Sequence, residues 1–189
     1  MEKLGNISER IVRKNTNMES SLPLTISAQY GLIDQGEFYN ARIASKDVSG
    51  YYLIKQGEFA YNKSSSDGYP FGTIKRLDKY EKGVLSTLYI VFSLDKDKVN
   101  SDYIVAFYDT AHWHKDVEKK AAEGARNHGL LNISSDDFFE TLVALPKEKS
   151  EQQEIGNCFI FLDDIINADS NKLNKIRTIK QSLLQKMFA

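Results

Sequence analysis

An apolar repeat near the end of the chain constrains the fold more than any other feature of the sequence. Ten positions from residue 155 to 187 alternate four and three residues apart, and eight of them are apolar. This is the heptad seam of a coiled-coil helix. One uninterrupted helix over the seam would be about 50 Å long at about 1.5 Å per residue. The seam consists of Ile155, Phe159, Leu162, Ile166, Asp169, Leu173, Ile176, Lys180, Leu183 and Met187. We therefore predict a coiled-coil dimerisation and spacer arm over residues 147–189.

The charges along this segment predict how two such helices would pair. Residues 134–170 carry a net charge of −7, whereas residues 171–189 carry +5 and no acid. Antiparallel pairing places each acidic half beside the partner's basic half, and parallel pairing places like charges together. The pattern favours an antiparallel homodimer in which the apolar seam residues form the interface. The alternative is a helix packed on its own domain, because Ile165, Ile179 and Leu184 broaden the apolar stripe.

Clusters of β-branched and aromatic residues recur between glycine-containing turn signals in the first 146 residues. They predict strands over residues 24–28, 51–54, 58–62, 71–77, 84–92 and 141–145. Helices are expected over residues 7–14, 101–108 and 110–123. Pro146 closes the last strand, because proline cannot donate to a strand ladder. The predicted fold class is α+β: a mixed-sheet domain over residues 1–146, followed by the long helix of residues 147–189.

The composition of the 189 residues is that of an ordinary globular protein, with 41% apolar and 27% charged residues and a net charge of -1. Cys158 is the only cysteine, which excludes an intrachain disulfide framework and a cysteine-based zinc site. The apolar runs at residues 88–92 and 158–162 are too short to span a membrane. The N-terminus lacks the pattern of a signal peptide. We expect a soluble, cytoplasmic protein that binds no membrane.

Signatures of catalysis are missing from the sequence. A phosphate-binding loop needs a Gly-Lys pair, which the chain lacks, and DNA amino-methyltransferases carry a Pro-Pro pair, whereas the prolines of this chain are isolated. Asp109, Glu118 and Lys120 could imitate a nuclease motif, but they fall in predicted helix and are better explained as surface charges. His112 and His114 are two residues apart, so they do not share a helical face as metal ligands would. We expect no catalytic residue and no metal site in this chain.

Two polar loops carry the groups that contact nucleic acids. Residues 61–76 combine hydroxyls, an amide, aromatic rings and bases, and residues 124–129 place Arg, Asn and His between two glycines. Lys and Arg bind phosphates, whereas Arg, Asn and hydroxyl side chains also contact base edges. The candidate DNA-binding residues are Asn62, Lys63, Ser64, Ser65, Tyr69, Lys75, Arg76, Arg126, Asn127 and His128. From composition alone, a solvated connection explains either loop equally well.

The whole arrangement resembles one half of the specificity subunit of type I restriction-modification enzymes. The segments Glu151-Gln-Gln-Glu-Ile-Gly156, Leu162-Asp-Asp-Ile-Ile166 and Lys180-Gln-Ser-Leu-Leu-Gln-Lys-Met-Phe188 are similar to the helical region of that family. Shorter pieces that look like parts of its target recognition domain lie at residues 3–7, 57–63, 83–89 and 124–134. The resemblance covers nearly the whole chain.

The resemblance implies a non-catalytic subunit that recognises a bipartite site in double-stranded DNA. Family members usually carry two recognition domains and two antiparallel helical regions, whereas this chain has one of each. The implied partners are methyltransferase (M) and restriction (R) subunits, and a second copy or second half-subunit as an antiparallel mate. S-adenosylmethionine, ATP and Mg would belong to the partner subunits, so no cofactor is expected in this chain. The competing interpretation is a coiled-coil adaptor whose globular head binds protein.

Overall fold

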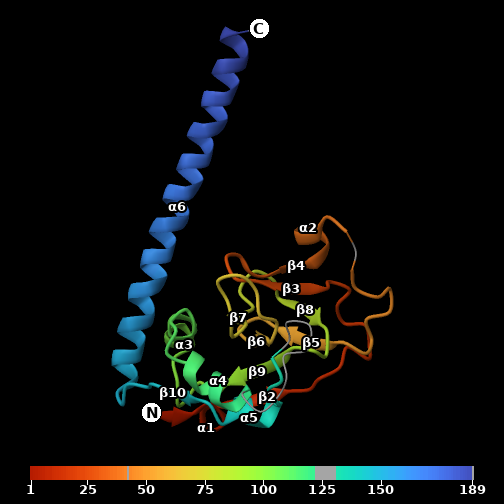
Figure 1. Ribbon diagram of the computed structural model, residues 1–189, viewed down its shortest axis with the longest axis vertical. Helices are drawn as coiled ribbons and strands as arrows, with labels where there is room; N and C mark the ends of the chain where they lie inside the picture. Colours follow the sequence, from red (N-terminus) through yellow and green to blue (C-terminus); the bar gives the residue numbers. More distant parts are fainter. Residues whose placement is uncertain (42, 122–130, 189) are drawn as a thin grey trace.

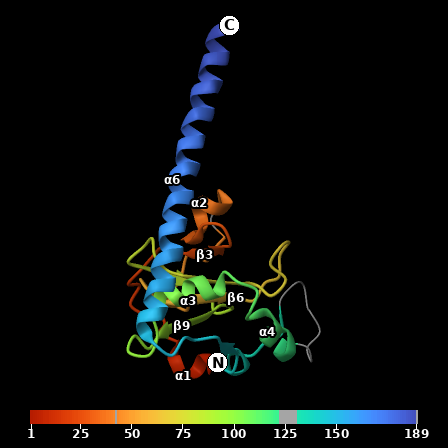
Figure 2. The ribbon, with the colours of Figure 1, turned by 90° about the vertical axis from the view of Figure 1, so that its left-hand side faces the viewer.

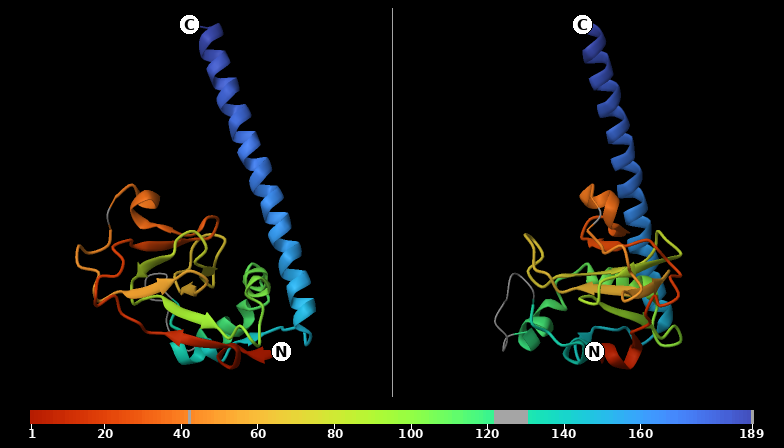
Figure 3. Two further views of the ribbon diagram at one scale, coloured as in Figure 1. Left: turned by 180° about the vertical axis from the view of Figure 1, so that it is seen from behind. Right: turned by 90° about the vertical axis from the view of Figure 1, so that its right-hand side faces the viewer.

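The computed structural model describes residues 1–41, 43–121 and 131–188. Figure 1 shows a head of small sheets and short helices, and one long helix, α6, that extends well beyond the head. Helix α6 runs from Lys149 to Met187 and contains 39 residues. Its C-terminal half stands clear of the head from behind and from the side as well (Figure 3). The predicted α+β class with a long C-terminal helix is confirmed.

Short elements build the head. The first part contains β1 (Glu2–Lys3), α1 (Leu4–Ile7), β2 (Ser8–Ile11), β3 (Leu24–Ser27), β4 (Gly31–Asp34), α2 (Gln35–Tyr39), β5 (Tyr52–Lys55) and β6 (Phe59–Asn62). The second part contains β7 (Thr73–Arg76), β8 (Lys82–Leu85), β9 (Ile90–Leu94), α3 (Ser101–Tyr108), α4 (His114–Ala121), α5 (Ser135–Phe139) and β10 (Leu142–Val143).

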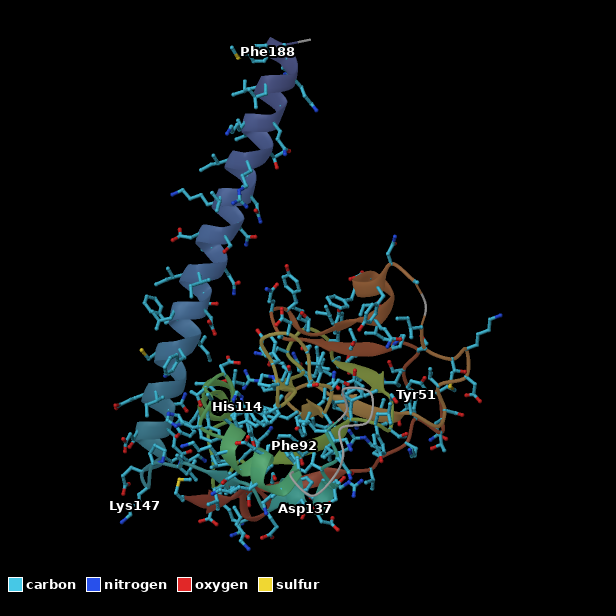
Figure 4. The ribbon with its side chains drawn as sticks, viewed as in Figure 1. Tyr51, Phe92, His114, Asp137, Lys147 and Phe188 are labelled. Carbon is cyan, nitrogen blue, oxygen red and sulfur yellow. The ribbon has the colours of Figure 1, made fainter. Side chains whose placement is uncertain are left out.

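An antiparallel sheet with the order β2-β9-β6-β7 forms the centre of the head, and the pairs β1–β10, β3–β4 and β5–β8 surround it. Alternate side chains of β6 point to opposite faces of this sheet. Phe59 and Tyr61 pack toward the helices, where Tyr61 stacks on Phe138 with 4.7 Å between the ring centroids. Phe92 of β9 belongs to the same cluster, deep inside the head in Figure 4. Ala60 faces a second cluster, formed with β3, β5 and β8. The central sheet is thus covered on both faces.

The structure confirms, with shifted ends, the strands predicted over residues 24–28, 51–54, 58–62, 71–77 and 141–145. The segment predicted as one strand over residues 84–92 forms two strands, β8 and β9. The backbone N–H of Tyr89 donates to the Ser86 carbonyl at 3.1 Å, which closes a turn between them. The turn lets β8 pair with β5 while β9 joins the central sheet between β2 and β6.

The helix predicted over residues 7–14 is wrong. Half of this segment forms β2, an edge strand in which Ser8 lies opposite Leu94 of β9. The chain then continues alongside β5, and the Arg13 guanidinium contacts the Glu58 carboxylate at 2.8 Å. Contacts with residues far away in the sequence outweigh the weak local helix propensity of this segment.

Helix α3 spans the residues predicted for it, but α4 begins at His114 instead of residue 110. A turn with a buried tryptophan separates the two helices. The indole of Trp113 donates to the Tyr108 carbonyl at 3.1 Å, and the Thr110 hydroxyl donates to the Phe107 carbonyl at 2.7 Å. These bonds use carbonyls at the end of α3 and stop it. The predicted end of the second helix, residue 123, lies outside the described residues.

The first turns of α6 rest against the N-terminus of α3 (Figure 2). Gln152 is 1% exposed, and its side-chain oxygen accepts a hydrogen bond from the Asn100 N–H at 2.8 Å. Gly156 lies so close to α3 that an added Cβ would be 2.9 Å from both the Asp102 Cβ and the Tyr103 nitrogen. The absence of a side chain at Gly156 therefore sets the distance between the two helices.

Packing on the head ends within these first turns. Ile155 packs against the main core cluster, whereas the other apolar seam residues are 45–74% exposed. The alternative of a helix lying along its own domain therefore holds only for the beginning of α6. The first turns of the helix belong to the packing of the head. The domain boundary at residue 146 stays a prediction.

Candidate nucleic-acid interface

A cleft of about 580 Å³ opens on the head between the β3–β4 turn, α2, the β6–β7 loop and the β8–β9 turn. We call it the polar cleft. Among the described residues that line it, Asp67 is the only one with a charged side chain. The serine, threonine and amide side chains of its lining are those of Thr25, Ser27, Gln29, Asn62, Ser64, Ser66 and Thr73. Such a surface suits a planar, uncharged ligand with hydrogen-bonding edges.

Local structure places aromatic rings at the rim of the polar cleft. The β3–β4 turn, where Gly31 has a φ of 77°, leaves Tyr30 59% exposed. Helix α2, which is capped by the Asp34 side chain, presents Phe38 and Tyr39, whose rings meet edge to face with 4.8 Å between the centroids. Exposed aromatic rings are stacking surfaces for planar groups such as bases.

The β6–β7 loop forms the opposite wall. The Asn62 side-chain oxygen accepts a hydrogen bond from the Ser64 N–H at 3.1 Å, and the backbones of Ser66 and Tyr69 bond to each other at 3.2 and 2.9 Å. Gly72 returns the chain to β7 with a φ of 81°, and an added Cβ there would lie 2.1 Å from the Asn62 carbonyl oxygen. The loop is therefore held by its own backbone, with Tyr69 projecting from it, 40% exposed.

The structure brings together part of the predicted DNA-binding set. Asn62, Ser64 and Tyr69 line the polar cleft. Lys63 and Ser65 lie in the same loop, and the Lys63 ammonium donates to a backbone carbonyl at 3.3 Å. The remaining loop candidates, Arg126, Asn127 and His128, lie outside the described residues. The DNA-binding role of the whole set stays a prediction.

Lys75 and Arg76, the candidates on β7, form ion pairs within the head. The Lys75 ammonium contacts the Asp109 carboxylate at 2.6 Å. The Arg76 side chain, 16% exposed, contacts Asp78 at 2.6 Å and Asp102 at 2.7 Å. Burial alone would lower the pKa of Arg76, but its hydrogen bonds and charge interactions with the two carboxylates raise it. Arg76 thus ties β7 to the start of α3, the helix on which α6 rests.

We expect Arg76→Ala to destabilise the head, because it leaves the Asp102 carboxylate, 26% exposed, without its charged partner. Loss of such a charge-assisted hydrogen bond typically costs about 1–3 kcal/mol. Urea unfolding would measure this cost. Lys75→Ala is the matched control, since its partner Asp109 is 48% exposed and an exposed pair contributes about 1 kcal/mol or less. Equal unfolding midpoints for the two variants would contradict this structural role.

A second groove, of about 610 Å³, continues from the polar cleft toward α6. We call it the helix-side groove. It shares Gln29 and Tyr69 with the polar cleft, and its far wall consists of Asp163, Ile166 and Asn167 of α6. The candidate interface on the head is therefore continuous with the beginning of the exposed arm.

The head wall of the helix-side groove contains His114, which Figure 4 shows on the side of the head nearer α6. Its ring lies 5.1 Å from the Phe71 ring, and burial lowers its pKa. His114 is therefore neutral near pH 7 and can donate or accept a hydrogen bond there. With Lys75 and Asp109 paired in the same wall, this wall also carries little net charge.

Sequence reasoning missed Gln29, Tyr30, Phe38 and Tyr39, which complete the polar cleft. The signal available was the Gln29-Tyr30-Gly31 turn directly after a predicted strand. Nothing local indicates that this turn faces the loop of residues 63–72. The two come together only because β3 and β4 pack beside β7 of the central sheet.

The competing catalytic interpretation gains no support from the structure. Asp109 is paired with Lys75, and Glu118 and Lys120 lie on α4, a different element. Within residues 1–41, 43–121 and 131–188, no three His, Cys, Asp or Glu side chains are grouped as metal ligands. Nor does any helix of this part of the chain have the length and apolar character needed to cross a membrane.

No protein-family model matches the sequence, and no curated protein matches it significantly. Solved structures, however, share the fold. The HsdS subunit from Thermoanaerobacter tengcongensis aligns over 88% of this chain and 42% of its own length, with a TM-score of 0.58 and 16% identity. A chain from a study of complex assembly and conformational transition of the type I R-M system aligns over 88% and 43%, with the same score and identity. This chain spans less than half of either, and the fold expected from the resemblance is confirmed.

Proposed function

We propose that this chain is the DNA-recognition half of a type I restriction-modification specificity subunit. The observation that carries the proposal is the fold shared with HsdS. In this chain, that fold mounts a head with a polar cleft on a long helix with an exposed apolar seam. In this function the head reads double-stranded DNA and the arm sets the spacing between two heads. Methyltransferase (M) and restriction (R) subunits carry out the chemistry with S-adenosylmethionine, ATP and Mg, so the chain itself is not an enzyme.

The polar cleft supports base recognition rather than phosphate binding. Its side-chain amides, Gln29 and Asn62, are of the type that bonds the N6 and N7 edge of adenine. Tyr30 and Tyr69 add stacking or methyl-contact surfaces at its rim. Phosphates would be held by lysines outside the cleft, such as Lys63 on the same loop. This division between positioning and reading contacts is general in DNA recognition.

The exposed seam supports pairing with a second copy of the chain. Seven apolar seam residues, 45–74% exposed, would form a long apolar surface on an isolated arm, interrupted at Asp169 and Lys180. Such surfaces are normally buried in an interface. Because the acids precede the bases along the arm, an antiparallel homodimer sets opposite charges side by side. A second half-subunit with the same pattern would satisfy the same requirements. Two heads at opposite ends would then read two half-sites at a fixed separation.

Duplex binding by the purified full chain tests this function. We expect affinity that falls with salt concentration, and a sequence preference that Asn62→Ala or Gln29→Ala relaxes at a cost of about 1–3 kcal/mol at one base position. Lys63→Ala should weaken binding to all duplexes alike, with a salt dependence flatter by about one unit of slope. Arg126→Ala and Asn127→Ala should also relax the preference. Absence of salt-sensitive duplex binding would favour the adaptor interpretation instead.

A further inference from the structure

One line of side chains on α6 faces the head. At the beginning of the helix this line packs on α3 through Gln152 and Gly156. Ile160 and Asp163 then face the α3 side of the head across a small groove, and Asn167 lies in the wall of the helix-side groove. At about 3.6 residues per turn these spacings keep the residues on one side of the helix. The seam residues Phe159 and Ile166 line the same two grooves, so the head-facing side of α6 also extends from this line toward the seam.

Beyond the head, the same side of α6 carries a row of uncharged hydrogen-bonding side chains. From Asn167 the spacing is four, three, four, three, four, and every member is exposed. We call this row the amide stripe; it consists of Asn167, Asn171, Asn174, Thr178, Gln181 and Gln185. The solvent face of a coiled-coil helix usually carries Glu and Lys. The Thr178 hydroxyl donates to the Asn174 carbonyl of its own helix at 3.0 Å. The amide side chains of the row both donate and accept hydrogen bonds, and they point instead to a hydrogen-bonding partner.

The charges beside the amide stripe favour an anionic partner. Lys175 and Arg177 flank it, and residues 171–189 contain five bases and no acid. Amides and hydroxyls commonly contact the phosphates and sugars of DNA next to Lys and Arg. The stripe also begins in the helix-side groove, which is continuous with the polar cleft through Gln29 and Tyr69. A duplex bound at the polar cleft could therefore extend along the helix-side groove to the amide stripe.

The position of the seam orients two stripes in a dimer. The seam lies about a third of a turn around α6 from the head-facing side, counted at about 100° per residue. The twofold axis of an antiparallel helix pair is perpendicular to the plane that contains the two helices. Rotation about this axis exchanges the two chains, but a group above the plane in one chain is also above it in the other. Both heads and both amide stripes therefore lie on the same side of the paired arms. A duplex that joins the two heads runs along the stripes.

We propose that the amide stripe is a second DNA-contact surface, which binds the backbone of the duplex between the two half-sites without reading its sequence. This inference rests on the proposed function and extends it from the head to the arm. The arm then both separates the heads and supports the DNA between them.

The test compares two variants that add the same charge to the same helix. Asn174→Glu places a carboxylate in the amide stripe, and Ala168→Glu places one away from both the stripe and the seam. The probe is a mixed-sequence duplex of about 40 base pairs, or about 140 Å at 3.4 Å per step. We expect Asn174→Glu to bind this duplex about tenfold more weakly than wild type, because the carboxylate repels the phosphates. Ala168→Glu should bind like wild type, and both variants should sediment like wild type.

Equal duplex affinity of the two variants would overturn the inference. The same holds if Asn174→Glu keeps its DNA affinity but loses binding to a methyltransferase subunit, because the stripe would then contact protein. If wild type itself binds no duplex, the proposed function fails rather than the assignment of the stripe alone.

Discussion

Replacing Leu173 and Ile176 together by glutamate is expected to leave the protein monomeric and to abolish recognition of a two-part site. Both side chains belong to the seam near the middle of α6, where they are 48% and 55% exposed on the single chain. Pairing of two such arms would bury four carboxylates among apolar side chains. A buried charge without a partner costs on the order of 3–5 kcal/mol, so the dimer should dissociate at micromolar concentrations. Sedimentation would measure the change in mass.

The matched control adds two glutamates elsewhere on the same helix, at Ala168→Glu with Ser182→Glu. These positions lie away from the seam, so this variant should remain a dimer. A seam variant that sediments like the control would show that the arms do not pair through the seam. Each seam-variant head should still bind a single half-site, since the substitutions are remote from the polar cleft.

The direction of pairing has its own measurement, because Cys158 is exposed and is the only cysteine. In an antiparallel pair centred on the middle of the seam, two labels at Cys158 would be separated by about 40 Å, at about 1.5 Å of helix rise per residue. A parallel pair would bring them to about 10 Å, the usual distance between packed helices. Spin-label distances near the shorter value would overturn the antiparallel arrangement and the two-ended geometry that follows from it.

The long helix could be predicted from the sequence because its signal is entirely periodic. Spacings of four and three residues specify a helix whatever surrounds it, and the order of acids and bases adds a direction. The periodicity could not predict how the first turns of α6 pack on the head. The contact depends on Gly156 meeting Asp102 and on Gln152 reaching Asn100. Partners more than fifty residues apart leave no pattern in a single sequence.

Most strands of the head and helix α3 could be predicted from the sequence, because clusters of β-branched and aromatic residues coincide with burial in these strands. Residues 7–14 were misassigned because β2 is an edge strand whose pairing with β9 decides its conformation. The candidate site shows the same limit. Composition identified the loop with Asn62 and Tyr69, but Gln29 reaches the cleft from another hairpin. Composition also could not distinguish Arg76, which is paired with Asp102, from a base available to phosphate.

Among substitutions in the contact between α6 and α3, Gly156→Val is expected to lower the stability most. An ordinary glycine in a helix interior can be replaced by alanine with a gain of about 1 kcal/mol. At Gly156 the same replacement should lower the stability instead of raising it, because an added Cβ would lie 2.9 Å from the Asp102 Cβ and from the Tyr103 backbone nitrogen. Neither atom is the end of a flexible side chain, so α6 must move away from α3, at a cost of about 1–3 kcal/mol or more.

This displacement of α6 should change both the stability of the protein and its recognition of DNA. Displacing α6 stretches the buried hydrogen bond between Gln152 and Asn100, one helical turn earlier. It also changes the direction in which the arm leaves the head, and a small change at the base is amplified along the 39 residues of α6. We expect lower unfolding midpoints for Gly156→Ala and still lower ones for Gly156→Val, together with a changed preference for the spacing between half-sites. Ser170→Ala and Ser170→Val, at an exposed position of the same helix, control for intrinsic helix propensity. If the Gly156 series matched the Ser170 series, close contact with α3 would not be what orients the arm.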